Sequence, residues 1–166
     1  TGSFKVRGAS NCIQTLSPEK KACGVITASA GNHAQGVALG ASKAGIKSTI
    51  VMPEGAPLAK IEATRGYGAE VVLAGSVYDE AFAEAVRIQK ETGATFVHAY
   101  DNPAVIAGQG TIGLEILEQC PDIKAIVVPV GGGGLLAGVA AAVKATAPHV
   151  KVYGVQATGA PAMYLS

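Results

Sequence analysis

Short apolar segments alternate with longer helical segments along the whole chain, and this alternation limits the possible folds. Strands separated by helices of about ten or more residues form βαβ units, and such units build parallel sheets. The sequence therefore predicts an α/β fold with a parallel sheet. We expect strands at 24–28, 48–52, 70–73, 95–97, 124–130 and 151–156, and helices at 4–16, 31–44, 57–65, 76–92, 103–119 and 135–145.

Three local details refine this pattern. Ser17-Pro18-Glu19 begins a short turn or helix, because proline is common at a first helical position. Ser76 is the expected N-cap of the helix that runs to Thr92. The segment 124–130 is nearly all apolar, which predicts a strand covered on both faces.

Composition narrows the choice of partners. Hydrophobic residues make up 49% of the chain and charged residues 15%, so we expect much of the surface to be buried in a core or against a partner. The formal net charge of +1 gives no reason to expect nucleic acid or an anionic membrane. No apolar run approaches the roughly 20 residues of a membrane span, and no signal peptide is visible. Cys12, Cys23 and Cys120 lack metal-ligand spacing, so we expect free thiols and a cytoplasmic location.

Four consecutive glycines, Gly131 to Gly134, lie between the most apolar predicted strand and a predicted helix. Glycines lack a Cβ, so their N–H groups can approach an anion closely, and the helix N-terminus adds partial positive charge. A tight turn and a dinucleotide fingerprint are the alternatives, since Gly132, Gly134 and Ala137 match G-x-G-x-x-A. A dinucleotide site needs an acidic residue about 20 positions further on, and none follows Asp122. A lone phosphate is therefore favoured.

Two more segments contain candidate functional groups. A predicted strand ends at Ala28 and a helix begins near Gly31, so the free N–H groups there and the Ser29 hydroxyl could bind a carboxylate. A simple N-cap is the alternative role for Ser29, and a structural hydrogen bond is the alternative for His33. Lys5, taken alone, fits a solvated surface charge.

Together and in this order, these segments resemble the pyridoxal-phosphate (PLP) enzymes of the tryptophan-synthase-β class, also called fold type II. The resemblance is closest to the threonine/serine dehydratases, or threonine ammonia-lyases, and covers essentially the whole chain. The segments that carry it are Thr1-Gly2-Ser3-Phe4-Lys5 with the following Val6-Arg7-Gly8-Ala9, then Ser29-Ala30-Gly31-Asn32-His33-Ala34-Gln35-Gly36, then Gly131-Gly132-Gly133-Gly134-Leu135.

The resemblance implies a three-layer parallel-sheet fold with a complete small domain and a partial large domain. Residues 24–101 would form the small mobile domain, while 1–23 and 102–166 would be parts of the large PLP-binding domain. That family continues beyond both ends of this sequence, so we expect the chain to be a fragment that alone is poorly active or unfolded. Family members are usually dimers or tetramers, which implies a homo-oligomer.

The resemblance also assigns roles to residues. Lys5 would bond the cofactor's aldehyde and then act as the base at the substrate's α-carbon, and both tasks need a neutral amine. The cofactor's phosphate would protonate the leaving β-hydroxyl. Cofactor binding would involve Phe4, Lys5, Asn32, Gly131, Gly132, Gly133, Gly134 and Leu135. Substrate binding would involve Ser29, Ala30, Gly31, Asn32, His33 and Gln35.

Two departures from relatives of this family refine the expected chemistry. Serine racemases of this class have a serine, the second base, at the position of Ala30, and a methyl group cannot move a proton. Elimination is therefore favoured over racemisation. Several relatives have a glutamate metal ligand at the position of Gln156, and Ala160 and Ala162 follow it here. Because Mg²⁺ and Ca²⁺ prefer carboxylate oxygens, we expect no metal site.

The expected reaction is the conversion of L-threonine or L-serine to a 2-oxo acid and ammonia, in isoleucine biosynthesis or threonine catabolism. One alternative is a β-replacement enzyme of the cysteine-synthase type, whose carboxylate loop typically reads Thr-Ser-Gly-Asn-Thr. Another is a non-catalytic phosphate- or nucleotide-binding module, and a third is a purely structural piece.

Overall fold

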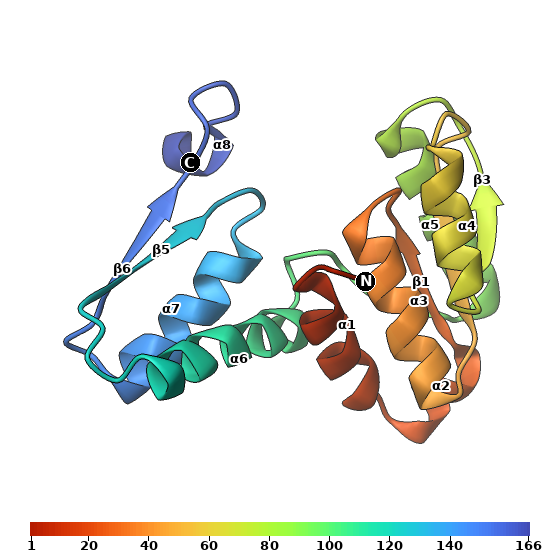
Figure 1. Cartoon of the computed structure of the whole chain (residues 1–166). Coiled ribbons are helices and arrows are strands. Elements are labelled where there is room, and N and C mark those ends of the chain that lie inside the picture. Colours follow the sequence, from red (N-terminus) through yellow and green to blue (C-terminus); the bar gives the residue numbers. More distant parts are fainter. The chain divides into compact units, whose positions relative to one another are not determined.

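The computed structural model describes all 166 residues, which divide into two compact units, Thr1–Ala99 and Tyr100–Ser166. Figure 1 labels most of their helices and strands. The first unit contains α1 (Lys5–Gln14), α2 (Pro18–Cys23), β1 (Val25–Ala28), α3 (Asn32–Ala44), β2 (Ser48–Met52), α4 (Leu58–Gly66), β3 (Glu70–Leu73), α5 (Tyr78–Thr92) and β4 (Thr95–Phe96). The second contains α6 (Pro103–Gln119), β5 (Ala125–Pro129), α7 (Gly134–Thr146), β6 (Lys151–Val155) and α8 (Ala162–Leu165).

The first unit is built on a parallel sheet with the strand order β3-β2-β1-β4. Strand β1 is central and pairs with β2 on one side and β4 on the other, so that Ile26 lies opposite both Thr49 and Phe96. The chain therefore builds outward from β1 through β2 to β3 and then returns to the other side of β1. In open α/β sheets, ligands bind beyond the carboxyl ends of the strands at such a reversal of strand order.

Helices cover both faces of this sheet. Ile26, Ala28 and Val51 pack against Ala81 and Ala85 of α5 in one apolar cluster. Side chains alternate between the faces of a strand, so the neighbours of these residues point to the opposite face. Helix α3 contacts β1 and β2, and all nine residues of those two strands are buried. The predicted α/β fold with a parallel sheet is confirmed.

Helix α1 packs closely along α3, and glycines of α3 make this possible. A Cβ at Gly36 would lie 3.1 Å from the backbone carbon of Lys5 and 3.1 Å from the backbone nitrogen of Val6. A Cβ at Gly40 would lie 3.2 Å from both the Ile13 side chain and the Ser10 hydroxyl. The first turn of α1, which carries Lys5, is thus fixed against the first half of α3.

The second unit pairs β5 with β6 in parallel and packs α7 against them. Helices α6 and α7 contact each other closely, since a Cβ at Gly138 would collide with the Ile106 carbonyl oxygen. Helix α6 begins with Pro103 after an Asn102 N-cap, whose Oδ1 accepts the N–H of Ala104 at 2.9 Å. The segment 124–130 was predicted to form a strand covered on both faces. Within this unit the observed strand, β5, is covered on one face only, because Val127 is 64% exposed.

Most predicted element positions agree with the structure to within one or two residues, with two exceptions. The N-cap of α5 is Val77 rather than the predicted Ser76. The reason is that Glu80 Oε2 accepts from both the Ser76 N–H, at 2.6 Å, and the Ser76 hydroxyl, at 3.0 Å. The short helix α8 was not predicted.

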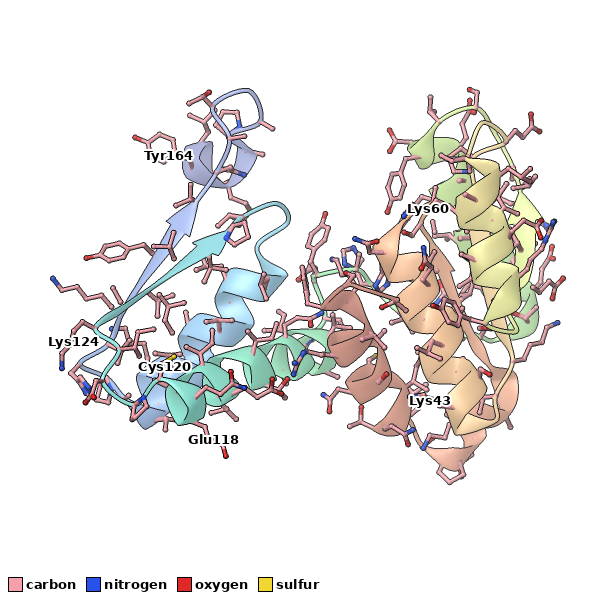
Figure 2. All side chains as sticks on the ribbon, in the orientation of Figure 1. Lys43, Lys60, Glu118, Cys120, Lys124 and Tyr164 are labelled. Carbon is pink, nitrogen blue, oxygen red and sulfur yellow. The ribbon has the colours of Figure 1, made fainter.

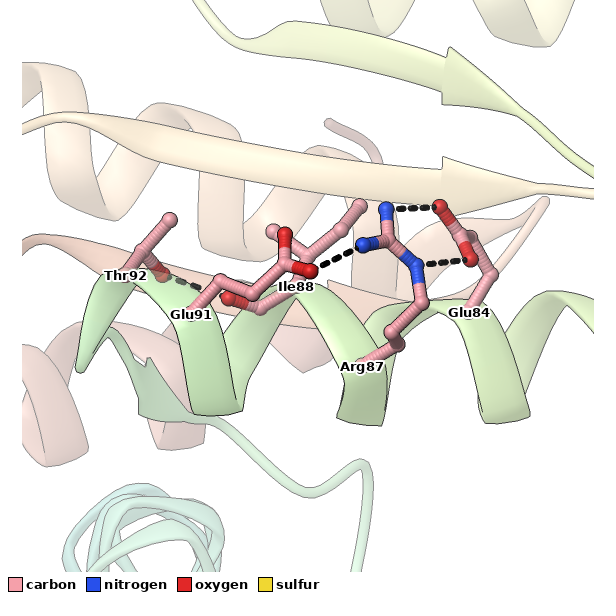
Figure 3. A network of polar contacts seen from close by, with 5 residues as sticks. All are labelled: Glu84, Arg87, Ile88, Glu91 and Thr92. Carbon is pink, nitrogen blue, oxygen red and sulfur yellow. Dashed lines mark hydrogen bonds and ion pairs between the residues drawn. The ribbon is translucent and has the colours of Figure 1, made fainter.

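The outer face of α5 carries a chain of ion pairs, as Figure 3 shows. Arg87 donates two hydrogen bonds of 2.7 Å to the carboxylate of Glu84 and a further one to Glu91. These carboxylates raise the pKa of the Arg87 guanidinium above its ordinary value. This is the solvated face expected of a surface helix, and exposed pairs of this kind contribute little to stability.

All three cysteines are free thiols, as predicted. Cys12 is buried in α1, and burial raises the pKa of its thiol. Cys120 is exposed at the end of α6, near Glu118 and Lys124 in the sequence (Figure 2). No helix is both long and apolar enough to cross a bilayer.

The predicted domain assignment differs from these compact units in the position of residues 1–23, which lie within the first unit here. The assignment concerns domains of a longer family fold, and it stays a prediction.

Candidate active site

Lys5 is the first residue of α1, and its side chain is half-buried. Its Nζ donates a 2.7 Å hydrogen bond to the carbonyl oxygen of Ala99, just beyond the carboxyl end of β4. Burial lowers the pKa of the Lys5 amine below its usual 10.5. The Phe4 ring centroid lies 5.5 Å from this nitrogen. The amine is therefore anchored beyond the carboxyl end of β4, on the side of β1 where the strand order reverses. Its neutral form is easier to reach there than on an open surface, because its pKa is lowered.

The turn from β1 into α3 supplies anion-binding groups next to this region. Ser29 Oγ accepts the N–H groups of Gly31, at 3.2 Å, and Ala34, at 3.3 Å. Its hydroxyl hydrogen remains free to donate. The N–H groups of Ala30, Asn32 and His33 donate to no acceptor in the structure. Unpaired N–H groups at a helix N-terminus are suited to a carboxylate or phosphate.

The side chains of α3 that were predicted to contact ligands fall into two groups. Asn32 is exposed and available to a ligand. Gln35 is 7% exposed, and its backbone N–H donates to the Gly31 oxygen at 3.4 Å. His33 is 3% exposed, and its Nε2 lies 2.8 Å from the carbonyl oxygen of Val97. Desolvation lowers the pKa of His33 to about 4, so its ring is neutral near pH 7.

The structure thus brings Lys5 and the first turn of α3 together. Gly36 touches the Lys5 backbone, and the Lys5 charge is among the influences on the pKa of His33. Three participants in this arrangement were not predicted: Thr27 and the carbonyls of Val97 and Ala99. A backbone carbonyl has no sequence signal, and Thr27 resembles any strand residue.

The four-glycine loop lies in the second unit, between the carboxyl end of β5 and α7. Gly133 is the N-cap of α7 and has a φ of +83°, a conformation that favours glycine. The N–H groups of Gly131, Gly132 and Gly133 donate to no acceptor. The space beside Gly131 is open, since a Cβ there would meet nothing within 4 Å.

A cavity of about 320 Å³ adjoins this loop. Gly132, Gly133 and Gly134 line it, together with Tyr100, Asp101, Ile106, Ala137 and Met163. Tyr100, which was not predicted, packs so closely on the loop that a Cβ at Gly132 would lie 2.5 Å from its ring. An open backbone with free N–H groups fits a phosphate group. Leu135, also predicted to bind the cofactor, packs into the apolar cluster beneath the sheet instead of lining this cavity.

Gln156, the position at which relatives of the expected family place a metal ligand, accepts the Tyr164 N–H at 3.0 Å and so helps to begin α8. The structure has no cluster of three or more His, Cys, Asp or Glu side chains that could hold a metal ion.

A family model described as "Pyridoxal-phosphate dependent enzyme" matches residues 1–166. The chain belongs to this family. The predicted resemblance is thereby confirmed, and so is pyridoxal phosphate as the cofactor of the family.

Named relatives make this membership more specific. The chain is 60% identical over 166 residues to the L-threonine ammonia-lyase of Thermotoga maritima, covering all of this chain and 41% of that protein. It superposes on the processed form of threonine deaminase isoform 2 from Solanum lycopersicum with a TM-score of 0.96 and 51% identity, covering 99% of this chain and 48% of that one. Maize serine racemase gives a TM-score of 0.93 and 43% identity, covering 96% and 49%. The chain thus spans less than half the length of these relatives.

Proposed function

We propose that the protein catalyses the PLP-dependent β-elimination of L-threonine or L-serine to a 2-oxo acid and ammonia. The observation that carries this proposal is the Lys5 amine, half-buried with a lowered pKa and anchored where the strand order reverses. The 60% identity to an L-threonine ammonia-lyase supports the choice of reaction. Bound pyridoxal phosphate supplies an electron sink for the charge left at the substrate's α-carbon.

Lys5 has two tasks in this proposal. Its Nζ would hold the cofactor through the aldehyde carbon, and the same nitrogen, as a free amine, would accept the proton from the substrate's α-carbon as a general base. Both tasks require a neutral amine, and partial burial favours that form. The Phe4 ring, whose centroid lies 5.5 Å from Nζ, would offer an apolar surface to the cofactor.

The turn between β1 and α3 holds the substrate. The free N–H groups of Ala30, Asn32 and His33 and the Ser29 hydroxyl bind the substrate's carboxylate. Gln35 contributes an amide beside that carboxylate, and the Asn32 side chain binds the cofactor's ring oxygen. The space beside Gly31 is open, since a Cβ there would meet nothing within 4 Å. Binding the carboxylate fixes the α-carbon relative to Lys5, which is the orientation that catalysis needs.

The loop Gly131–Gly134 holds the cofactor's phosphate through its free N–H groups. Gly133 and the N-terminus of α7 add the partial positive charge of the helix. For Leu135 we propose cofactor binding through the backbone N–H group alone, because its side chain packs into the apolar cluster of the second unit.

One residue bears on the outcome of the reaction. Ala30 offers no second proton-transfer group, which supports elimination over racemisation even though a serine racemase is among the structural relatives.

We also propose a homo-oligomer in the cytoplasm. The absence of a bilayer-crossing helix is compatible with that location.

Two measurements on the full-length natural protein test the proposal. After borohydride reduction with PLP, mass spectrometry should find the pyridoxyl group on Lys5. Steady-state assays should give a 2-oxo acid from L-threonine or L-serine, and O-acetylserine with sulfide should be a poor pair of substrates. An adduct on another lysine, or preference for O-acetylserine, would contradict the proposal. Absence of any adduct would favour a phosphate-binding module.

A further inference from the structure

One backbone carbonyl in the first unit accepts two buried side-chain donors. Thr27 Oγ1 donates to the Val97 oxygen at 2.9 Å, and His33 Nε2 lies 2.8 Å from the same oxygen. Thr27 is 1% exposed and His33 is 3% exposed. A carbonyl oxygen has two lone pairs and can only accept, so both groups donate and the His33 ring carries its hydrogen on Nε2. Both acceptor positions of this carbonyl are therefore filled.

The same residue is also fixed through its nitrogen. The Val97 N–H donates to the Ile26 oxygen at 2.9 Å, which continues the pairing of β4 with β1. Val97 is thus held by β1 on one side and by the His33 ring of α3 on the other. Two residues further along the chain, the Ala99 carbonyl accepts the Lys5 amine at 2.7 Å.

This arrangement is costly as a purely structural contact. The His33 Nδ1 atom is buried and has no hydrogen-bond partner. A buried polar atom without a partner opposes folding, and an apolar side chain of similar size would avoid that cost. Thr27 alone would satisfy the Val97 carbonyl. The second donor therefore adds positional restraint to a segment whose hydrogen bonding is otherwise complete.

We propose that His33 and Thr27 are positioning residues for Lys5: by clamping the Val97 carbonyl, they fix the segment 97–99 and hence the Ala99 carbonyl that anchors the Lys5 amine. This inference rests on the proposed function, because Lys5 must be the reactive amine for its position to matter. Neither residue touches the reacting atoms through its side chain. Loss of either donor removes one of the two side-chain restraints on this segment.

Matched pairs of variants test this in the full-length natural protein. His33→Leu and Thr27→Val remove a donor while keeping approximate size. His33→Gln and Thr27→Ser keep a donor, because the glutamine amide nitrogen can occupy the place of Nε2. Thermal unfolding and circular dichroism first establish which variants fold. The readouts are the fraction of Lys5 that borohydride traps at a fixed PLP concentration, and kcat and KM for L-threonine.

We expect His33→Leu and Thr27→Val to lower the trapped fraction and to reduce kcat by about 10- to 100-fold, since misplacement by about 1 Å has costs of that size. KM should change by less than kcat does, because both variants keep the backbone N–H groups and the Ser29 hydroxyl that bind the carboxylate. His33→Gln and Thr27→Ser should recover most of both losses. A purely structural role would instead lower the unfolding temperature while the folded fraction kept its kcat and trapping.

Wild-type trapping and kcat in folded His33→Leu and Thr27→Val would overturn the inference. Equal losses in the donor-keeping variants would overturn it too, because the hydrogen bond would then not be the cause. Should His33→Leu fail to fold, the Thr27 pair decides alone. If the wild-type protein forms no adduct on Lys5, the proposed function itself fails, and that result is distinct from these.

Discussion

At the scale of single residues, the proposed chemistry depends most on Lys5. If Lys5 Nζ is both the attachment point and the base, Lys5→Ala should lower kcat/KM for L-threonine by roughly 10⁴-fold, equivalent to about 5.5 kcal/mol of barrier. Lys43→Ala is the matched control, because Lys43 is an exposed lysine on α3 (Figure 2). The control should keep wild-type kinetics in the same steady-state assay. A Lys5→Ala enzyme within tenfold of wild type would contradict the assignment.

His33 makes a separate prediction about pH. Its folded pKa of about 4 lies below the ordinary 6.5, so the unfolded chain binds more protons between these values. Stability from the neutral ring is fully present above about pH 6.5 and is lost as pH falls through 4, amounting to about 3 kcal/mol. Urea unfolding of the full-length protein from pH 7 to pH 4 should show this decline. His33→Gln, which does not titrate, should show a shallower decline, and an identical slope would refute the assignment.

At the scale of elements, the close contact of α1 with α3 sets the position of Lys5. A Cβ at Gly36 would lie 3.1 Å from the Lys5 and Val6 backbones, which are not flexible side-chain ends. Gly36→Ala should therefore push α1 away and destabilise the protein by about 1–3 kcal/mol. Chemical denaturation measures this change, and trapping at Lys5 should fall as well.

Gly66→Ala provides the control for that variant. Gly66 ends α4, and a Cβ there would meet nothing within 4 Å. Alanine is the better helix former by about 1 kcal/mol, so this change should be neutral or stabilising. Equal behaviour of the two variants would show that the α1–α3 contact is not tight.

The elements themselves follow from the sequence because their signals are local. The apolar, β-branched strands and the glycines or prolines between elements placed most boundaries within one or two residues. The start of α5 was missed because the Glu80 side chain binds back to Ser76, which moves the N-cap to Val77. Helix α8 has only four residues, too few for a periodic pattern.

The site was predictable only where a motif is local. The Lys5 segment, the Ser29 turn and the glycine run each lie in one stretch of sequence. The Val97 and Ala99 carbonyls join the site because β4 pairs with β1 across about 70 intervening residues, and such pairing has no local signal. Tyr100 packs on the glycine loop for the same kind of reason.

At the scale of the whole molecule, the proposed function uses two chemical groups of one cofactor, its aldehyde and its phosphate. Lys5 lies in the first unit and Gly131–Gly134 in the second. The phosphate is what the glycine loop should recognise, whereas the aldehyde is what Lys5 should bind. Pyridoxal, which has the aldehyde and no phosphate, therefore separates the two contributions.

The most direct test is the apparent dissociation constant of PLP and of pyridoxal, read from borohydride trapping at Lys5 in the full-length natural protein. Gly131→Val fills the open space beside the loop, and Gly159→Val is its control, since a Cβ at either glycine meets nothing within 4 Å. Gly131→Val should lower the affinity for PLP toward that for pyridoxal and leave the affinity for pyridoxal unchanged. Gly159→Val should change neither affinity. Wild-type PLP affinity in a folded Gly131→Val protein would contradict the assignment of the cofactor's phosphate to the glycine loop.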